Sequence, residues 1–69
     1  MSLKEIKAIE EKLSHLALNG DKEAAIQYAD LQRFRKDWES RKSAENWNDF
    51  VYAAQGAHAW LGIWHRNSN

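Results

Sequence analysis

Apolar side chains in the first third of the chain recur at helical spacing. Between about residues 3 and 18 they return every three or four positions, as Ile6, Ile9, Leu13 and Leu16. This spacing predicts an amphipathic helix, because such positions share one face of an α-helix. Ser2 and Glu5 stand at the spacing of a capping box, which satisfies the free amides at a helix start. Asn19-Gly20 is typical of a helix end, so we expect the first helix to stop there.

A second helix is expected over about residues 22 to 40. Gly20 can adopt the left-handed conformation that ends one helix, and Asp21 is placed to cap the next. So short a turn favours an antiparallel hairpin. Arg35 lies at the edge of the inward face, where we expect it either to stack on Trp38 or to extend to solvent. The residues expected to point inward are Ala24, Gln27, Leu31, Phe34 and Trp38.

A third helix is expected over about residues 46 to 65. Residues 40–43 carry no apolar side chain, and Ser43 or Asn46 could each cap a new helix. No glycine or proline interrupts this stretch, so one long helix running through Ser43 is the alternative. Residues 66–69 are expected to form a polar tail.

The third segment differs from the other two in having two apolar stripes. The first stripe consists of Trp47, Phe50, Ala54, Ala57, Leu61 and Trp64. The second stripe consists of Ala53, Gly56, Trp60 and Ile63. From Phe50 to His65 no side chain carries a permanent charge. A two-helix hairpin can cover only one stripe, so the other must meet something else.

These patterns predict an all-α fold, in which a helical hairpin and an aromatic-rich C-terminal helix form a small bundle completed by dimerisation. Small residues let a partner helix approach closely, and tryptophans anchor many protein interfaces. A core helix inside one monomer is the alternative explanation of the two stripes. The segment is too short, and with Gln55 and His58 too polar, for a typical membrane span. The residues predicted at the interface are Trp47, Ala53, Gly56, Ala57, Trp60, Ile63 and Trp64.

The balance of basic and acidic residues argues against a nucleic-acid-binding surface. Ten lysines and arginines balance ten aspartates and glutamates, so no overall field steers the chain towards phosphates. The alternative function that we keep is a nucleic-acid-binding regulator using Arg33, Lys36, Arg41 and Lys42. Asp30 and Asp37 lie at pairing distance from Arg33 on the same helix, which makes a solvated face of ion pairs the simpler interpretation.

The sequence offers little for catalysis or cofactors. There is no cysteine, so disulfides and thiolate metal sites are excluded. The histidines His15, His58 and His65 lack the spacing of a helical metal site, and we expect no catalytic residue, no metal and no cofactor. A chain of 69 residues allows one domain.

The function expected from these residues is that of a small, non-enzymatic accessory or regulatory protein. It would form a homodimer and would also bind an unidentified protein. It would need neither a membrane nor a small-molecule substrate. The N-terminus is charged within four residues and lacks the apolar segment of a secretion signal, so we expect a cytoplasmic location. Small chains without catalytic chemistry are common among accessory proteins of bacteriophages and mobile elements, which is a base-rate expectation only.

Overall fold

Three helices account for nearly all of the chain. The computed structural model describes the backbone of residues 1–68 and the side chains of residues 1–63. Helix α1 spans Leu3–Leu18, α2 spans Lys22–Ser40 and α3 spans Ala44–Ser68. The bounds of α1 and α2 are those expected from the sequence, and no strand occurs within residues 1–68. The fold is therefore all-α, as predicted.

Local hydrogen bonds explain where α1 begins and ends. The Ser2 hydroxyl accepts from the backbone N–H of Glu5, while the Glu5 carboxylate accepts from the N–H of Ser2, which completes the capping box. At the other end Gly20 has a φ of +96°. The N–H of Gly20 donates to the carbonyl of Ala17, and that of Asp21 donates to the carbonyl of Leu16. This pair of bonds is a Schellman motif.

The turn between α1 and α2 is short because Asp21 forms hydrogen bonds with both helices. Its N–H closes the end of α1, and its side chain accepts from the N–H of Ala24 in the first turn of α2. The caps predicted for this turn are thereby confirmed.

A break separates α2 from α3, so the alternative of one continuous helix is wrong. The Ser43 hydroxyl caps α3 by accepting from the N–H of Asn46 at 3.1 Å. The Asn46 side-chain amide donates to the carbonyls of Asp37 and Arg41, which closes the free end of α2. Helix α3 starts two residues before the expected Asn46 and continues to Ser68. The tail expected at 66–69 is thus helical as far as Ser68, and residue 69 lies outside the described residues.

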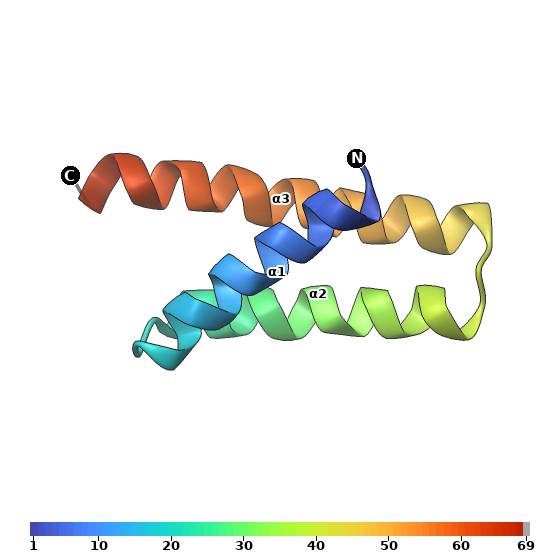
Figure 1. Ribbon diagram of the computed structural model, residues 1–69, viewed down its shortest axis with the longest axis horizontal. Helices are drawn as coiled ribbons and strands as arrows, with labels where there is room; N and C mark the ends of the chain where they lie inside the picture. The colour runs from blue at the N-terminus through green and yellow to red at the C-terminus, as the bar shows by residue number, and fades with distance from the viewer. Residues whose placement is uncertain (69) are drawn as a thin grey trace.

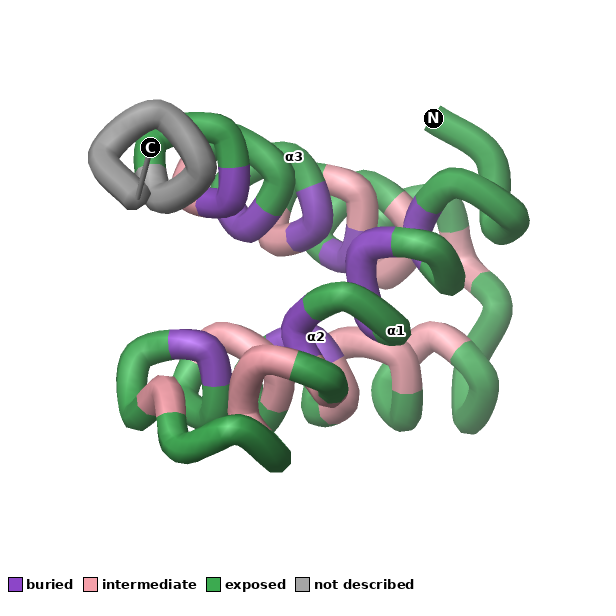
Figure 2. Tube along the Cα trace, turned by 60° about the vertical axis from the view of Figure 1, so that its left-hand side comes forward, coloured by how far each residue is buried: buried purple, intermediate pink, exposed green. Residues whose placement is uncertain are grey.

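The three helices pack around one line of buried residues. Helices α2 and α3 run antiparallel, and α1 crosses them diagonally on one side (Figure 1). Helix α1 packs mainly on α2 and touches α3 less. In Figure 2 the buried positions of each helix turn towards the other two. The buried apolar residues are Ile6, Ile9, Leu13, Ala24, Leu31, Phe50, Ala54, Ala57 and Leu61.

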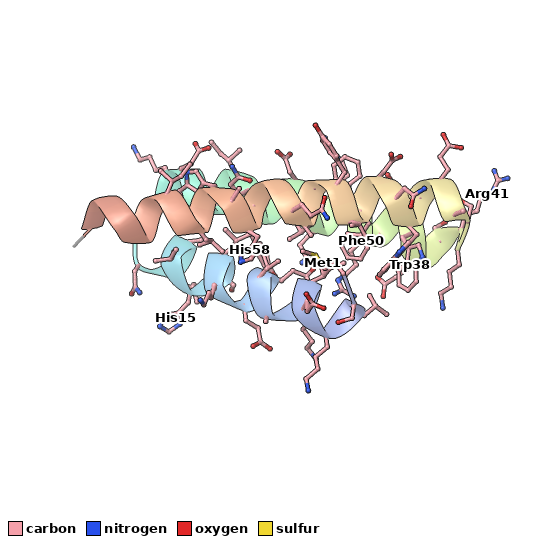
Figure 3. The ribbon with its side chains drawn as sticks, turned by 90° about the horizontal axis from the view of Figure 1, so that it is seen from above. Met1, His15, Trp38, Arg41, Phe50 and His58 are labelled. Carbon is pink, nitrogen blue, oxygen red and sulfur yellow. The ribbon has the colours of Figure 1, made fainter. Side chains whose placement is uncertain are left out.

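Aromatic rings fill the end of the bundle where α2 connects to α3. The ring centroids of Trp38 and Trp47 are 5.3 Å apart, and each lies 6.0 Å from that of Phe50. Tilted and edge-on pairs at these distances add to the stabilisation from apolar burial alone. Trp38 and Phe50 are both labelled in Figure 3, near the end of the bundle at which α2 connects to α3. This cluster fixes α3 against α2 near their connection.

Candidate functional site

The second stripe of α3 lies on the side of the α2–α3 pair that α1 does not cover. On the other flank of α3, His58, Leu61 and Gly62 line a cavity of about 300 Å³ together with residues of α1. At 3.6 residues per turn, Ala53 and Trp60 fall on the opposite flank from His58 and Gly62. Figure 3 shows α1 on the His58 side of α3. Within the described chain, no third helix packs on the second stripe.

The solvent exposure of the residues in the second stripe increases with their distance from the core. Ala53 and Trp60 are half-buried and pack against the edge of the core. Gly56 is exposed, and Ile63 keeps 54% of its surface in contact with solvent. These four residues form a continuous apolar strip along a helix whose flanking positions include Tyr52, which is 80% exposed. Apolar surface of this kind is typical of a protein interface.

Gly56 is not explained by packing among the described residues. Within that part of the chain, a Cβ built on Gly56 would meet no atom within 4 Å, although glycine inside a helix costs about 1 kcal/mol relative to alanine. Any close approach that requires this glycine must therefore come from another molecule. Gly62 is also open by the same measure, but it lies on the opposite flank beside α1.

Two of the predicted interface residues, Trp47 and Ala57, do not belong to the exposed strip. Ala57 is only 1% exposed and lies in the core between the helices, so its side chain offers almost no surface to a partner. Trp47 is half-buried in the aromatic cluster, where its ring already packs against Trp38 and Phe50. The side chain of Trp64 lies outside the described residues. The physical reason is that Phe50, Ala54, Ala57 and Leu61 of the first stripe form part of the chain's own core, which leaves the second stripe at its edge.

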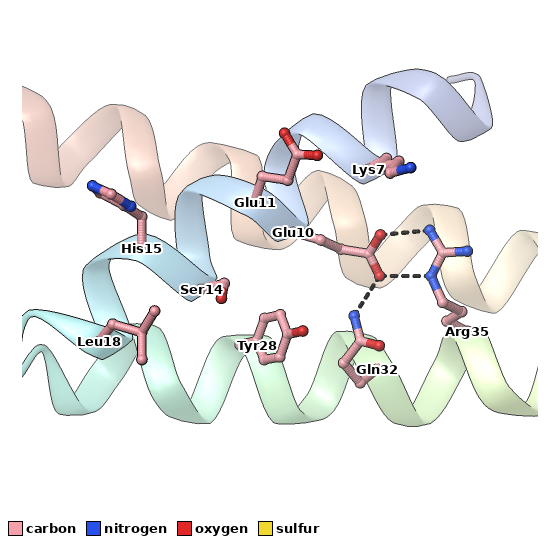
Figure 4. A pocket seen from close by; sticks show the side chains of 9 residues that line it. All are labelled: Lys7, Glu10, Glu11, Ser14, His15, Leu18, Tyr28, Gln32 and Arg35. Carbon is pink, nitrogen blue, oxygen red and sulfur yellow. Dashed lines mark hydrogen bonds and ion pairs between the residues drawn. The ribbon is translucent and has the colours of Figure 1, made fainter.

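A buried polar network joins α1 to α2. The Arg35 guanidinium donates from Nε to Glu10 Oε2 at 2.7 Å and from Nη2 to Glu10 Oε1, and the Gln32 amide also donates to Oε2 (Figure 4). Glu10 is only 6% exposed. Its hydrogen bond raises the pKa of the Arg35 guanidinium above the ordinary value, against an opposing effect of burial. Both oxygens of the Glu10 carboxylate therefore accept hydrogen bonds, as a buried charge requires.

This network was missed at the level of sequence. The prediction for Arg35 was stacking on Trp38 or extension to solvent, and the structure instead places it on Glu10 and over the ring of Phe50 at 5.3 Å. A signal was present, because Glu10 falls between Ile6 and Leu13 on the apolar face of α1. An acid and a base that interrupt the apolar faces of two helices joined by a tight turn can pair across the hairpin.

An open groove of about 540 Å³ runs along α1 and α2 beside this network. Tyr28 lies in the middle, the Glu10–Arg35 pair at one end, and Leu18, which is 84% exposed, at the other (Figure 4). The charged groups of the pair are already satisfied by one another, so they offer little to a charged ligand. The groove has no feature that selects one chemical class of occupant.

The four cations of the nucleic-acid alternative do not form one free surface. Arg33 pairs with Asp30 at 3.6 Å and lies over the ring of Phe34. The Lys42 ammonium lies 5.4 Å from the centre of the Trp38 ring. Lys36 is on the exposed face of α2, and Arg41 is the residue at which that helix ends. Ion pairing and stacking leave fewer charges for phosphates than the sequence count suggests.

Comparison with known proteins adds no family to this description. No protein-family model, no curated protein and no solved structure matches the chain. Among the described residues, no helix combines the length and apolar character needed to cross a membrane. The same part of the chain holds no group of three potential metal-binding side chains.

Proposed function

We propose that this protein is a non-enzymatic binding module that works as a homodimer, with the second stripe of α3 as its interface. In this role it is an accessory or regulatory factor that acts by occupying a surface of another protein. The observation that carries the proposal is the apolar strip formed by half-buried Ala53 and Trp60 and exposed Gly56 and Ile63, on the flank of α3 away from α1.

Two properties of this strip support the proposal. It contains a tryptophan held at its edge by the core, which is the arrangement of an anchor residue in an interface. It also lies on a helix without a charged side chain from Phe50 to Ile63, and depletion of charge is typical of interface centres. A chain this small gains from a partner, since its own core is limited.

Nucleic-acid binding remains the weaker candidate. It would depend on Arg33, Lys36, Arg41 and Lys42, of which Arg33 is paired with an acid and Lys42 lies on an aromatic ring. A regulator of this class would bind with a steep dependence on salt concentration. Electrophoretic retardation of DNA or RNA that weakens sharply with added salt would favour this class over the homodimer interface.

The experiment compares two substitutions that place the same charge at exposed apolar positions of two helices. Ile63→Lys introduces an ammonium into the second stripe, and Leu18→Lys introduces one into the last turn of α1, outside the stripe. Both side chains are exposed, Ile63 to 54% and Leu18 to 84%, so neither substitution buries a charge in the chain's own core. We expect Ile63→Lys to reduce the solution mass to that of one chain, while Leu18→Lys leaves the wild-type mass unchanged. Equal masses for wild type and Ile63→Lys would contradict the proposal.

A further inference from the structure

The order of small and large residues along the second stripe sets how two copies fit. The small residues Ala53 and Gly56 come first, and the large residues Trp60 and Ile63 follow. When two such helices lie antiparallel about a two-fold axis, each large residue of one copy faces a small residue of the other. When they lie parallel, Trp60 faces Trp60 and Gly56 faces Gly56. The two indoles then clash, and the two glycines leave a gap between the helices.

We propose that the second stripe binds the same stripe of a second copy in antiparallel orientation, with Trp60 of each chain packed over Gly56 of the other and Ile63 over Ala53. This proposal rests on the homodimer proposed above and adds its orientation and register. The open space at Gly56, where a Cβ would touch nothing within 4 Å, is then the space that the second copy's indole occupies.

Charge at the two ends of α3 favours the same orientation. Glu45 and Asp49 are acidic and lie in the first two turns, whereas Arg66 is basic and follows the stripe in the sequence. An antiparallel pair brings the acidic end of each helix to the basic end of the other. A parallel pair brings like charges together. The antiparallel arrangement also sets the two helix dipoles in opposition, which is favourable.

Single cysteines test the orientation directly, because the natural chain has none. Ala53→Cys and Ile63→Cys are prepared separately and also mixed, and each sample is oxidised in a glutathione redox buffer. In the antiparallel dimer the two different positions meet across the axis. Two copies of the same position lie ten residues apart along the helices, about 15 Å, which is beyond the reach of a disulfide. Ala29→Cys, on the exposed face of α2, is the control for random collision.

We expect the mixture to give a disulfide-linked pair of unlike chains, identified by its mass, while each variant alone gives no more linked dimer than Ala29→Cys. Efficient linkage of either variant alone would overturn the antiparallel register. Absence of the mixed product from a protein whose wild type has a dimeric mass would also overturn the register, with the homodimer left standing. A wild type with the mass of one chain would overturn both proposals.

Discussion

Glu10 of α1 and Arg35 of α2 form a bidentate ion pair across the helical hairpin, with the Glu10 side chain buried and that of Arg35 partly exposed. Gln32 donates a third hydrogen bond to the same carboxylate. Taking a carboxylate out of water is costly, and the cost is offset only when both its charge and its hydrogen-bonding capacity are matched. We infer that the pair fixes the relative position of α1 and α2, because a shifted hairpin would leave Glu10 buried without its partner.

Removal of one member of this pair is expected to destabilise the protein strongly. Glu10→Ala leaves the Arg35 guanidinium partly buried without its carboxylate, and we expect a loss of about 3 kcal/mol in the free energy of unfolding. The double variant Glu10→Met, Arg35→Met removes both charges and fills similar volume, so it should recover most of that loss. Urea denaturation of the wild type, Glu10→Met, Arg35→Met and the double variant gives the coupling free energy.

The exposed pair Arg33–Asp30 provides the matched control. Its side chains are 69% and 56% exposed, and pairs of this kind contribute less than about 1 kcal/mol. We expect Asp30→Ala to change stability by less than about 0.5 kcal/mol. If Glu10→Ala behaved like Asp30→Ala, the buried pair would have no special role in the hairpin.

The pKa of Arg35 sets a second expectation for the same pair. Its hydrogen bond to Glu10 raises this pKa in the folded protein. A group with a raised folded pKa contributes stability fully below its unfolded pKa and loses it as pH rises through the folded pKa. For arginine this loss falls far above neutrality. The stability difference between wild type and Arg35→Met should therefore be constant from neutral to mildly alkaline pH, and a decline over that interval would contradict the assignment.

Gly20 should respond to substitution in the opposite sense from the helical glycines. Its φ of +96° closes the Schellman motif between α1 and α2. Alanine is strained in this conformation, so we expect Gly20→Ala to lower the free energy of unfolding by about 1 kcal/mol. Thermal unfolding followed by circular dichroism measures this change, and an unchanged midpoint would show that the turn relaxes without cost.

The parts of the fold that depend on local chemistry could be predicted from the sequence. Ser2, Gly20 and Asp21 fix helix ends through hydrogen bonds to residues a few positions away, so both ends of α1 and the start of α2 follow from short motifs. The Glu10–Arg35 pair spans 25 residues and depends on how α1 crosses α2, which apolar spacing within one helix does not specify. For the same reason the sequence indicated two stripes on α3 but not which of them the hairpin covers.

Gly56 and Gly62 form a matched pair that separates helix propensity from packing against a partner. Among the described residues, neither has an atom within 4 Å of the added Cβ position, so alanine at either site should stabilise an isolated chain by up to about 1 kcal/mol. In the proposed dimer only Gly56 faces the indole of a second copy. We expect Gly62→Ala to raise the melting temperature and leave the dimer dissociation constant unchanged.

Gly56→Ala is expected to weaken dimerisation, because its methyl group occupies part of the space proposed for Trp60 of the second copy. Sedimentation equilibrium gives the dissociation constant of each variant, and a rise of roughly tenfold corresponds to about 1.4 kcal/mol. The same gain in stability and the same dissociation constant for both alanine variants would place the interface elsewhere.

The central claim is that the second stripe is covered by a second copy of this chain. The most direct measurement is the absolute mass of the wild-type protein in solution, determined by light scattering over a range of concentrations. The account predicts a mass near twice the 8.1 kDa of one chain, falling towards a single chain on dilution, and the mass of one chain at every concentration for Trp60→Ala. A wild-type mass of 8.1 kDa at all concentrations would contradict it.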